Sequence, residues 1–271
     1  MACRTAKAAD PTCTLLVGSL TSVSADWVER AAKAGTFVGA DGVSFHSYAD
    51  DLQKFRRTIE LVCDLAGKLA PPGRKLELWN TEWGVTDTTF DADLPNLPPR
   101  RLLPAPSFLD GAAEVVKRDC LSMALGVKRS FYYLHNEVGG AGSYCNWSAI
   151  EYTRTPRAKL IARMALEDLT CGAKVAQLLQ QSGSGNVTAV VFARGDAGSL
   201  AAVWLDENTK ARLLMPAGKN VEIFDLFGNP LPPGTPKSVA LSAVPIYVTA
   251  KISAAEMASL LQTGRMVSAS H

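Results

Sequence analysis

The stretch Lys-Leu-Glu-Leu-Trp-Asn-Thr-Glu-Trp-Gly at residues 75–84 decides the fold, because an apolar strand here leads directly into the carboxylate of Glu82. Side chains alternate between the two faces of a strand. This alternation predicts that Leu76, Leu78, Asn80 and Glu82 share one face. The ordinary alternative is a glutamate that ends a strand in solvent, because charged side chains are exposed by default. The segments around the stretch must decide between the two.

Strands and helices alternate on both sides of this stretch. The apolar patterns predict strands over residues 14–20, 42–48, 75–82 and 130–135, and helices beginning near residue 24 and covering 50–69, 108–125 and 155–170. This order is typical of parallel βαβ units, either in a doubly wound sheet or in part of a (β/α) barrel. About four units fit before residue 172, whereas a complete eight-stranded barrel needs about 250 residues.

The pattern changes after Gly172. Short strands are predicted at 187–194, 199–205, 210–215, 220–225, 237–242 and 245–250, separated by turn residues such as Gly195-Asp196 and Pro232-Pro233-Gly234. Such spacing is typical of an antiparallel β-sandwich. The predicted organisation is therefore α/β plus all-β: a partial barrel at 1–172, a sandwich at 173–252, and a short helix and tail at 253–271.

Composition excludes several classes of protein. The chain has 271 residues, 47% of them hydrophobic, and a formal net charge of +2, so it lacks the basic surface of a nucleic-acid binder. No apolar run approaches the roughly 20 residues of a membrane span, so we expect no membrane partner. Six scattered cysteines lack the C-x-x-C spacing of a zinc site, and we expect neither a metal nor an organic cofactor.

Three segments together resemble a clan A retaining glycoside hydrolase, most closely families 39 and 5. Residues 79–84 resemble the end of barrel strand seven, which carries the nucleophile in that clan. Residues 41–48 resemble strand six, and residues 223–230 with 245–248 resemble the sandwich that follows these barrels. The resemblance implies that the chain begins after barrel strand four and contains strands five to eight.

The resemblance assigns the nucleophile to Glu82. In double displacement by a retaining O-glycosidase, one carboxylate attacks the anomeric carbon while a second, about 5 Å away, protonates the leaving oxygen. The nucleophile must stay ionised, so hydrogen-bond donors have to stabilise its charge. His46 and Tyr48 suit this role, because alternation places them with Gly42 and Ser44 on one face of the preceding strand.

Further residues are expected to bind or support a carbohydrate substrate. Aromatic rings pack on pyranose faces, and Tyr132 and Tyr133 lie on opposite faces of one strand, so at most one of them faces the pocket. Ordinary core packing is the alternative for each aromatic residue. The complete set of support residues predicted here is His46, Tyr48, Asn80, Trp83, Tyr133, His135 and Trp147.

The acid/base of the clan, the Glu of an Asn-Glu pair ending strand four, has no equivalent here. The one Asn-Glu pair, Asn136-Glu137, lies in a glycine-rich loop after another strand, and Asp50 and Asp51 are expected to cap a helix. We therefore expect the chain to be inactive alone. Its open sheet edges should pair with a missing N-terminal barrel half or with another copy.

Two alternatives stay open at this point. The chain could be a non-catalytic carbohydrate-binding or structural module, in which binding would survive Glu82→Gln but not Trp83→Ala or Trp147→Ala. It could also be an unrelated α/β enzyme, although G-x-S-x-G, G-x-G-x-x-G and P-loop motifs are absent from the sequence.

Overall fold

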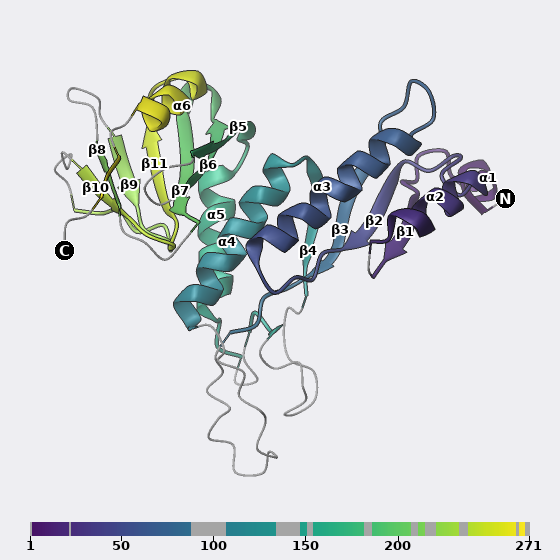
Figure 1. The fold of residues 1–271 in the computed structure, drawn as a ribbon, viewed down its shortest axis with the longest axis horizontal. Helices are drawn as coiled ribbons and strands as arrows, with labels where there is room; N and C mark the ends of the chain where they lie inside the picture. Colours follow the sequence, from purple (N-terminus) through teal and green to yellow (C-terminus); the bar gives the residue numbers. More distant parts are fainter. Residues whose placement is uncertain are drawn as a thin grey trace, which may run out of the picture. The chain divides into compact units, whose positions relative to one another are not determined.

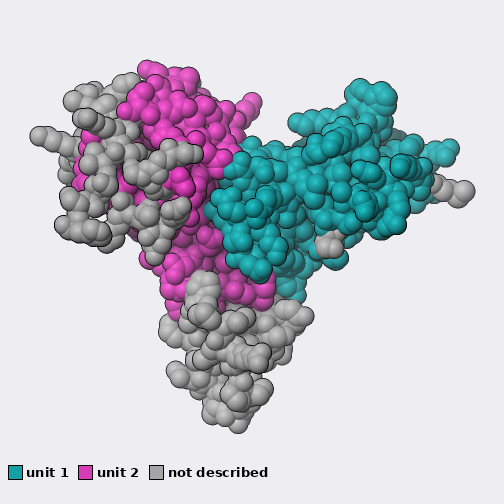
Figure 2. Space-filling view, in the orientation of Figure 1, with its two compact units in different colours: residues 1–84, 121–133 teal, residues 85–120, 134–271 magenta. Residues whose placement is uncertain are grey.

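A computed structural model describes most of the chain. The described residues are 2–21, 23–87, 107–133, 147–150, 154–181, 186–206, 211–214, 221–232, 238–263 and 266–268. They form two compact units, shown in teal and magenta in Figure 2. The first unit contains residues 1–84 and 121–133, and the second contains residues 85–120 and 134–271.

The first unit is built on a four-stranded parallel sheet in the order β1-β2-β3-β4 (Figure 1). Its strands are β1 (Leu16–Leu20), β2 (Gly42–His46), β3 (Glu77–Trp83) and β4 (Val127–Tyr132). Helices α1 (Ala2–Ala9), α2 (Ala25–Lys33) and α3 (Leu52–Leu69) belong to the same unit, and α4 (Phe108–Ala124) joins β3 to β4. The predicted parallel βαβ units are confirmed.

Helix α3 has the apolar face that the sequence predicts. Phe55, Ile59, Val62 and Leu65 recur at three- and four-residue spacing, and all four are buried. Asp51 caps the helix, because its side chain accepts a hydrogen bond from the backbone N–H of Lys54 at 2.6 Å. The capping role expected for this residue is confirmed.

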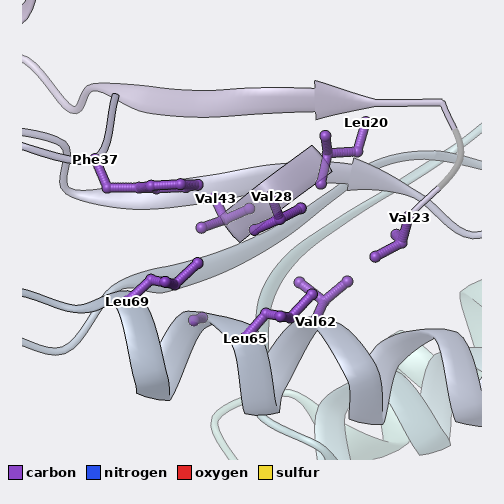
Figure 3. A pocket seen from close by; sticks show the side chains of 9 residues that line it. Leu20, Val23, Val28, Phe37, Val43, Val62, Leu65 and Leu69 are labelled. Carbon is purple, nitrogen blue, oxygen red and sulfur yellow. The ribbon is translucent and has the colours of Figure 1, made fainter. Parts of the chain in front are cut away.

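A small apolar gap remains between the sheet and helices α2 and α3 (Figure 3). Its lining includes Leu20, Val28, Val43, Val62 and Leu69. None of the lining side chains carries a hydrogen-bonding group, so a sugar hydroxyl placed there would lose its hydrogen bonds to water. The gap is part of the core.

The sheet of the first unit has two open edges among the described residues. Within them, β1 pairs only with β2 and β4 pairs only with β3. Inside the sheet the backbones approach closely: a Cβ atom on Gly42 would lie 2.5 Å from the carbonyl oxygen of Glu77. Glycine is therefore required at this position of β2.

The second unit contains two antiparallel sheets. The larger sheet has the order β5 (Lys174–Gln181), β6 (Val187–Ala193), β7 (Ser199–Leu205), β11 (Ile246–Ala250) and β9 (Val221–Phe224), and the smaller one has the order β10 (Ser238–Leu241), β8 (Ala211–Leu214) and β12 (Met266–Ser268). A short 3₁₀ turn, η3 (Gly195–Ala197), joins β6 to β7. Both sheets and α6 (Ala254–Thr263) contribute to one hydrophobic core.

The six strands predicted after Gly172 are confirmed as antiparallel strands, and two more are present. Strand β5 was not predicted because it lies at the edge of the sheet, where polar residues such as Lys174 and Gln180 are exposed and interrupt the apolar pattern of a strand. Strand β12 is only three residues long. The chain's last predicted helix is α6, at Ala254–Thr263.

The five-stranded sheet is covered on both faces. Every residue of β7 is buried, and Trp204 and Tyr247 are fully buried. Burial raises the pKa of Tyr247, and the nearby Cys120 and Asp119 of α4 raise it further. Residues 108–120 of α4 and the whole of α5 (Ala158–Thr170) thus lie in the same unit as the antiparallel sheets, whereas the last turn of α4 belongs to the first unit. The predicted boundary at residue 172 is not tested by this packing and stays a prediction.

Among the described helices, none combines the length and the apolar character needed to cross a membrane.

Candidate active site

A bulge in β3 determines where Glu82 points. Phe45 of β2 pairs with Asn80, but the next residue, His46, pairs with Glu82, so Thr81 is an extra residue on β3. The pairing of β3 with β4 also shifts between Asn80 and Trp83. A bulge of this kind reverses the alternation of the strand beyond it.

This reversal corrects the face predicted from sequence. Leu78 and Asn80 are buried on one face of β3, and Trp83 rejoins them after the bulge. Glu82 instead lies on the opposite face with Thr81, whose hydroxyl is 3.5 Å from that of Ser44. The predicted common face of Leu78, Asn80 and Glu82 is therefore wrong. The prediction assumed a regular strand.

Glu82 meets two side chains from the end of β2. The hydroxyl of Tyr48 donates a hydrogen bond to Oε1 of Glu82 at 2.6 Å, and Nδ1 of His46 lies 3.4 Å from Oε2. The side chain of Glu82 is 33% exposed, so it contacts Tyr48 and His46 and still remains partly accessible to solvent. The structure thus brings together the three residues that the sequence placed at neighbouring strand ends.

Tyr48 is held in its neutral, hydrogen-bond-donating form. Burial raises the pKa of its phenol well above the usual range, and the hydrogen bond to Glu82 raises it further. An ionised phenol here would repel the carboxylate. Tyr48 can therefore donate its hydrogen bond to the carboxylate of Glu82 at neutral pH.

Only one of the two tyrosines at the end of β4 lies on the Glu82 side. The ring of Tyr133 meets that of Tyr48 edge-on at 6.5 Å, and its backbone N–H donates to the carbonyl of Trp83 at 2.6 Å. Tyr132 packs against the ring of Trp83 at 5.2 Å, on the other face. The expectation that the two tyrosines lie on opposite faces is confirmed, and a substrate contact of Tyr133 stays a prediction.

Trp83 is a core residue and not a sugar platform. Its side chain is fully buried, its Nε1 donates to the hydroxyl of Ser130 at 2.7 Å, and its ring packs on Phe55 of α3 at 5.7 Å. A stacking platform must expose one face of its ring. The predicted substrate contact of Trp83 is therefore wrong, because the bulge turns this residue inward.

Asn80 also lies away from the Glu82 face. Its side chain is fully buried and bonds to the hydroxyl of Ser47, which is buried as well. Direct contact with a substrate, expected if it shared a face with Glu82, is excluded by this burial. Its role is structural support.

The remaining predicted residues, His135 and Trp147, are not tested by the structure. His135, together with Glu137, lies outside the described residues. Trp147 is half-buried and belongs to the second unit, so its substrate contact stays a prediction. In the part of the chain that is described, no group of three or more His, Cys, Asp or Glu side chains could hold a metal ion.

Sequence reasoning missed two residues that shape the site, Thr81 and Ser47. Thr81 donates from its hydroxyl to the carbonyl of Phe45 at 3.3 Å, beside the bulge. Ser47 supplies the buried hydroxyl that meets Asn80. The available signal was three consecutive polar residues, Asn80, Thr81 and Glu82, since an uninterrupted alternation with apolar residues would be expected in a regular half-buried strand.

Comparison with known proteins places this fold among glycoside hydrolases. No protein-family model matches the sequence, and no curated protein matches it. Solved structures do match, among them a family 39 glycoside hydrolase from the gut symbiont Bacteroides cellulosilyticus WH2 (TM-score 0.70, 17% identity, 91% of this chain and 52% of that one) and a GH39 beta-xylosidase from Caulobacter crescentus (TM-score 0.56, 15% identity, 92% and 59%). The chain therefore has a glycosidase-like fold and spans slightly more than half the length of each.

Proposed function

We propose that the chain is the C-terminal part of a retaining glycosidase and that Glu82 is its nucleophile. The observation that carries the proposal is the placement of Glu82 at the carboxyl end of a parallel strand, with Tyr48 donating to it at 2.6 Å. Catalytic residues of (β/α) barrels come from this end of the strands. The shared fold with family 39 structures supports the same assignment.

In this proposal the four βα units correspond to strands five to eight of an eight-stranded barrel. The order β1-β2-β3-β4 follows the order of the chain, as it must in such a barrel. Both edge strands are open among the described residues, so a second set of four strands could close the sheet. The antiparallel sheets of the second unit would then be the accessory sandwich.

In this proposal, the chain supplies the nucleophile, and the half of the barrel that carries strands one to four supplies the general acid. An oxygen of Glu82 attacks the anomeric carbon and the bond to the leaving oxygen breaks, while an acid on the other half gives that oxygen its proton. Water then attacks the anomeric carbon, its proton returns to the same group, and Glu82 is released as a carboxylate. Tyr48 and His46 orient Glu82 in both steps.

Because the acid/base is supplied by the other half, the chain alone should not hydrolyse glycosides. Losing a general acid costs about 10² to 10⁴ in rate for natural leaving groups, and four missing strands also remove half of the pocket. The test is to assay the purified chain and a chimera that adds barrel strands one to four of the Bacteroides cellulosilyticus WH2 hydrolase. Hydrolysis by the chimera but not by the bare chain supports the proposal. Hydrolysis by the bare chain contradicts it.

The non-catalytic alternative is weakened by one observation. A carbohydrate-binding surface needs exposed aromatic rings, and Trp83, one of its expected platforms, is fully buried. We therefore retain the glycosidase as the proposed function.

A further inference from the structure

The bulge that turns Glu82 toward Tyr48 is itself held by a buried side chain. With Thr81 inserted, the backbone of β3 no longer follows the regular ladder beyond Asn80. The carbonyl groups of Phe45 and Glu82 lie beside this irregular step. Such groups need hydrogen-bond donors when they are removed from water.

Asn80 supplies one further donor to each of these carbonyls; the Glu82 carbonyl also accepts from the backbone N–H of Ser47 at 3.2 Å. In the amide orientation that satisfies all its neighbours, its nitrogen donates to the carbonyl oxygens of Glu82 and Phe45, both at 3.2 Å, and its oxygen accepts from the hydroxyl of Ser47 at 2.6 Å. Asn80 and Ser47 are both fully buried. One carboxamide therefore joins β2 and β3 on either side of the bulge.

The side chain at position 80 must donate to two carbonyl oxygens and accept from a hydroxyl, which the carboxamide of asparagine does. An aspartate could accept from Ser47 but would place a carboxylate against two carbonyl oxygens. A leucine of similar size would provide no donor at all. Thr81 reaches the Phe45 carbonyl at 3.3 Å from the other side of the strand, but no hydrogen bond from its side chain joins the Glu82 carbonyl.

We propose that Asn80 is a positioning residue, whose buried carboxamide fixes the bulge and so holds Glu82 against Tyr48. Its importance for catalysis rests on the proposed role of Glu82 as nucleophile. The geometric effect on the Tyr48–Glu82 pair is independent of any reaction, and it can be measured in this chain without a substrate.

The test uses 3-fluorotyrosine placed at position 48 and followed by ¹⁹F NMR during a pH titration. The groups that act on this phenol are Glu82, Tyr133 and Tyr132, with His46 beside it. Glu82→Gln defines the signal of a phenol without its carboxylate partner. In Asn80→Ala, the acid dissociation constant of the phenol should shift toward the Glu82→Gln value by about tenfold or more, because losing an adjacent carboxylate moves a pKa by about one unit or more.

Leu78→Ala is the matched control. Leu78 is buried on the same face of β3, two residues before Asn80, and its truncation should destabilise the unit without moving the Tyr48 titration. Ser47→Ala, a milder change, should shift the titration in the same direction as Asn80→Ala but by less. The inference is overturned if folded Asn80→Ala or Ser47→Ala titrates as the unmodified chain does, or if Leu78→Ala shifts the titration equally. An unshifted titration would leave Glu82 free to be the nucleophile, so the two proposals fail separately.

Discussion

At the scale of single residues, the carboxylate of Glu82 is held by contacts of unequal strength. The bond from Tyr48, at 2.6 Å, is a charge-assisted hydrogen bond, whereas His46 lies at 3.4 Å, beyond ordinary hydrogen-bond length. Tyr48 should therefore contribute more than His46 to stabilising the ionised form of Glu82.

Replacing Tyr48 by phenylalanine should lower kcat/KM of a completed barrel about 10- to 100-fold, since a hydrogen bond to a charged group contributes about 1.5–3 kcal/mol. The measurement is steady-state hydrolysis by the chimera with and without Tyr48→Phe. Tyr247→Phe is the control, because the buried hydroxyl of Tyr247 has no hydrogen-bond partner in the described structure. Equal losses in the two variants would contradict the role given to Tyr48.

A second cluster of charged residues lies in the second unit. Asp87 is fully buried, and its Oδ1 lies 2.7 Å from Arg157 and 3.2 Å from Lys159, which also donates to the carbonyl of Val85 at 3.0 Å. Asp87, in the segment after β3, is thereby bound to Lys159 of α5 and to Arg157, the residue that precedes α5. Gly111 of α4 packs directly against Asp87, because a Cβ atom on Gly111 would lie 2.7 Å from the Cβ atom of Asp87.

Asp87→Ala should lower the free energy of unfolding by about 3–5 kcal/mol, because it removes the buried carboxylate that Arg157 and Lys159 both contact. Chemical denaturation followed by circular dichroism measures the change. Asp196→Ala is the control, since Asp196 is exposed in η3 and its loss should cost less than about 0.5 kcal/mol. A loss below about 1 kcal/mol in Asp87→Ala would show that the cluster contributes little.

At the scale of elements, Asp41 joins three segments of the first unit. Its carboxylate binds Lys7 of α1 at 2.8 Å, the backbone N–H of Leu15 before β1 at 2.8 Å, and Arg74 before β3 at 3.0 Å. The hydrogen bond from Lys7, followed by that from Leu15, lowers the pKa of Asp41. The folded protein therefore binds this proton less tightly than the unfolded chain.

The sign of the resulting pH dependence follows from linkage. The stabilisation by Asp41 is complete above the pKa of an unfolded aspartate and disappears as the pH falls through the lower, folded pKa. The difference in unfolding free energy between the unmodified chain and Asp41→Asn should thus shrink on going from pH 7 to about pH 3. Urea titrations at both pH values measure it.

Asp64→Asn is the control for this experiment. Asp64 forms an exposed i,i+4 pair with Lys68, a type of pair that contributes little. Its effect should be small at both pH values. A difference for Asp41→Asn that stays constant with pH would contradict the account.

Element order was predictable from sequence, but the orientation of the strand end was not. The spacing of Phe55 and Ile59 in α3 and the turn residues after Gly172 are local signals, and the structure confirms the elements that they predict. The bulge at Thr81 depends on pairing with β2, which is a contact between distant segments. The bulge places Glu82 on one face and Trp83 on the other. The predicted hydrogen bond from Tyr48 to Glu82 is therefore present, whereas the predicted substrate contact of Trp83 is wrong.

At the scale of the whole molecule, the first unit presents surface that the proposed barrel would bury. Phe131 is 47% exposed and stacks on Trp79 at 6.1 Å, and Arg129 lies over the ring of Trp79. The edges β1 and β4 are open among the described residues. Open edges and exposed aromatic residues favour association.

The chain alone should therefore dimerise or aggregate in solution, and the chimera with barrel strands one to four should not. Light scattering over a range of concentrations measures both. A stable, monodisperse monomer of the bare chain would contradict this expectation.

Covalent labelling of Glu82 tests the central proposal most directly. The chimera is incubated with a panel of 2-deoxy-2-fluoro glycosyl fluorides, whose glycosyl-enzyme esters hydrolyse slowly, and is then digested and analysed by mass spectrometry. We predict a fluoroglycosyl adduct on the peptide containing Glu82, absent in Glu82→Gln, together with a loss of turnover on the order of 10⁴-fold or more in that variant. A chimera that turns over glycosides while Glu82→Gln retains its rate, or that carries the adduct on another residue, would contradict the assignment of Glu82 as the nucleophile.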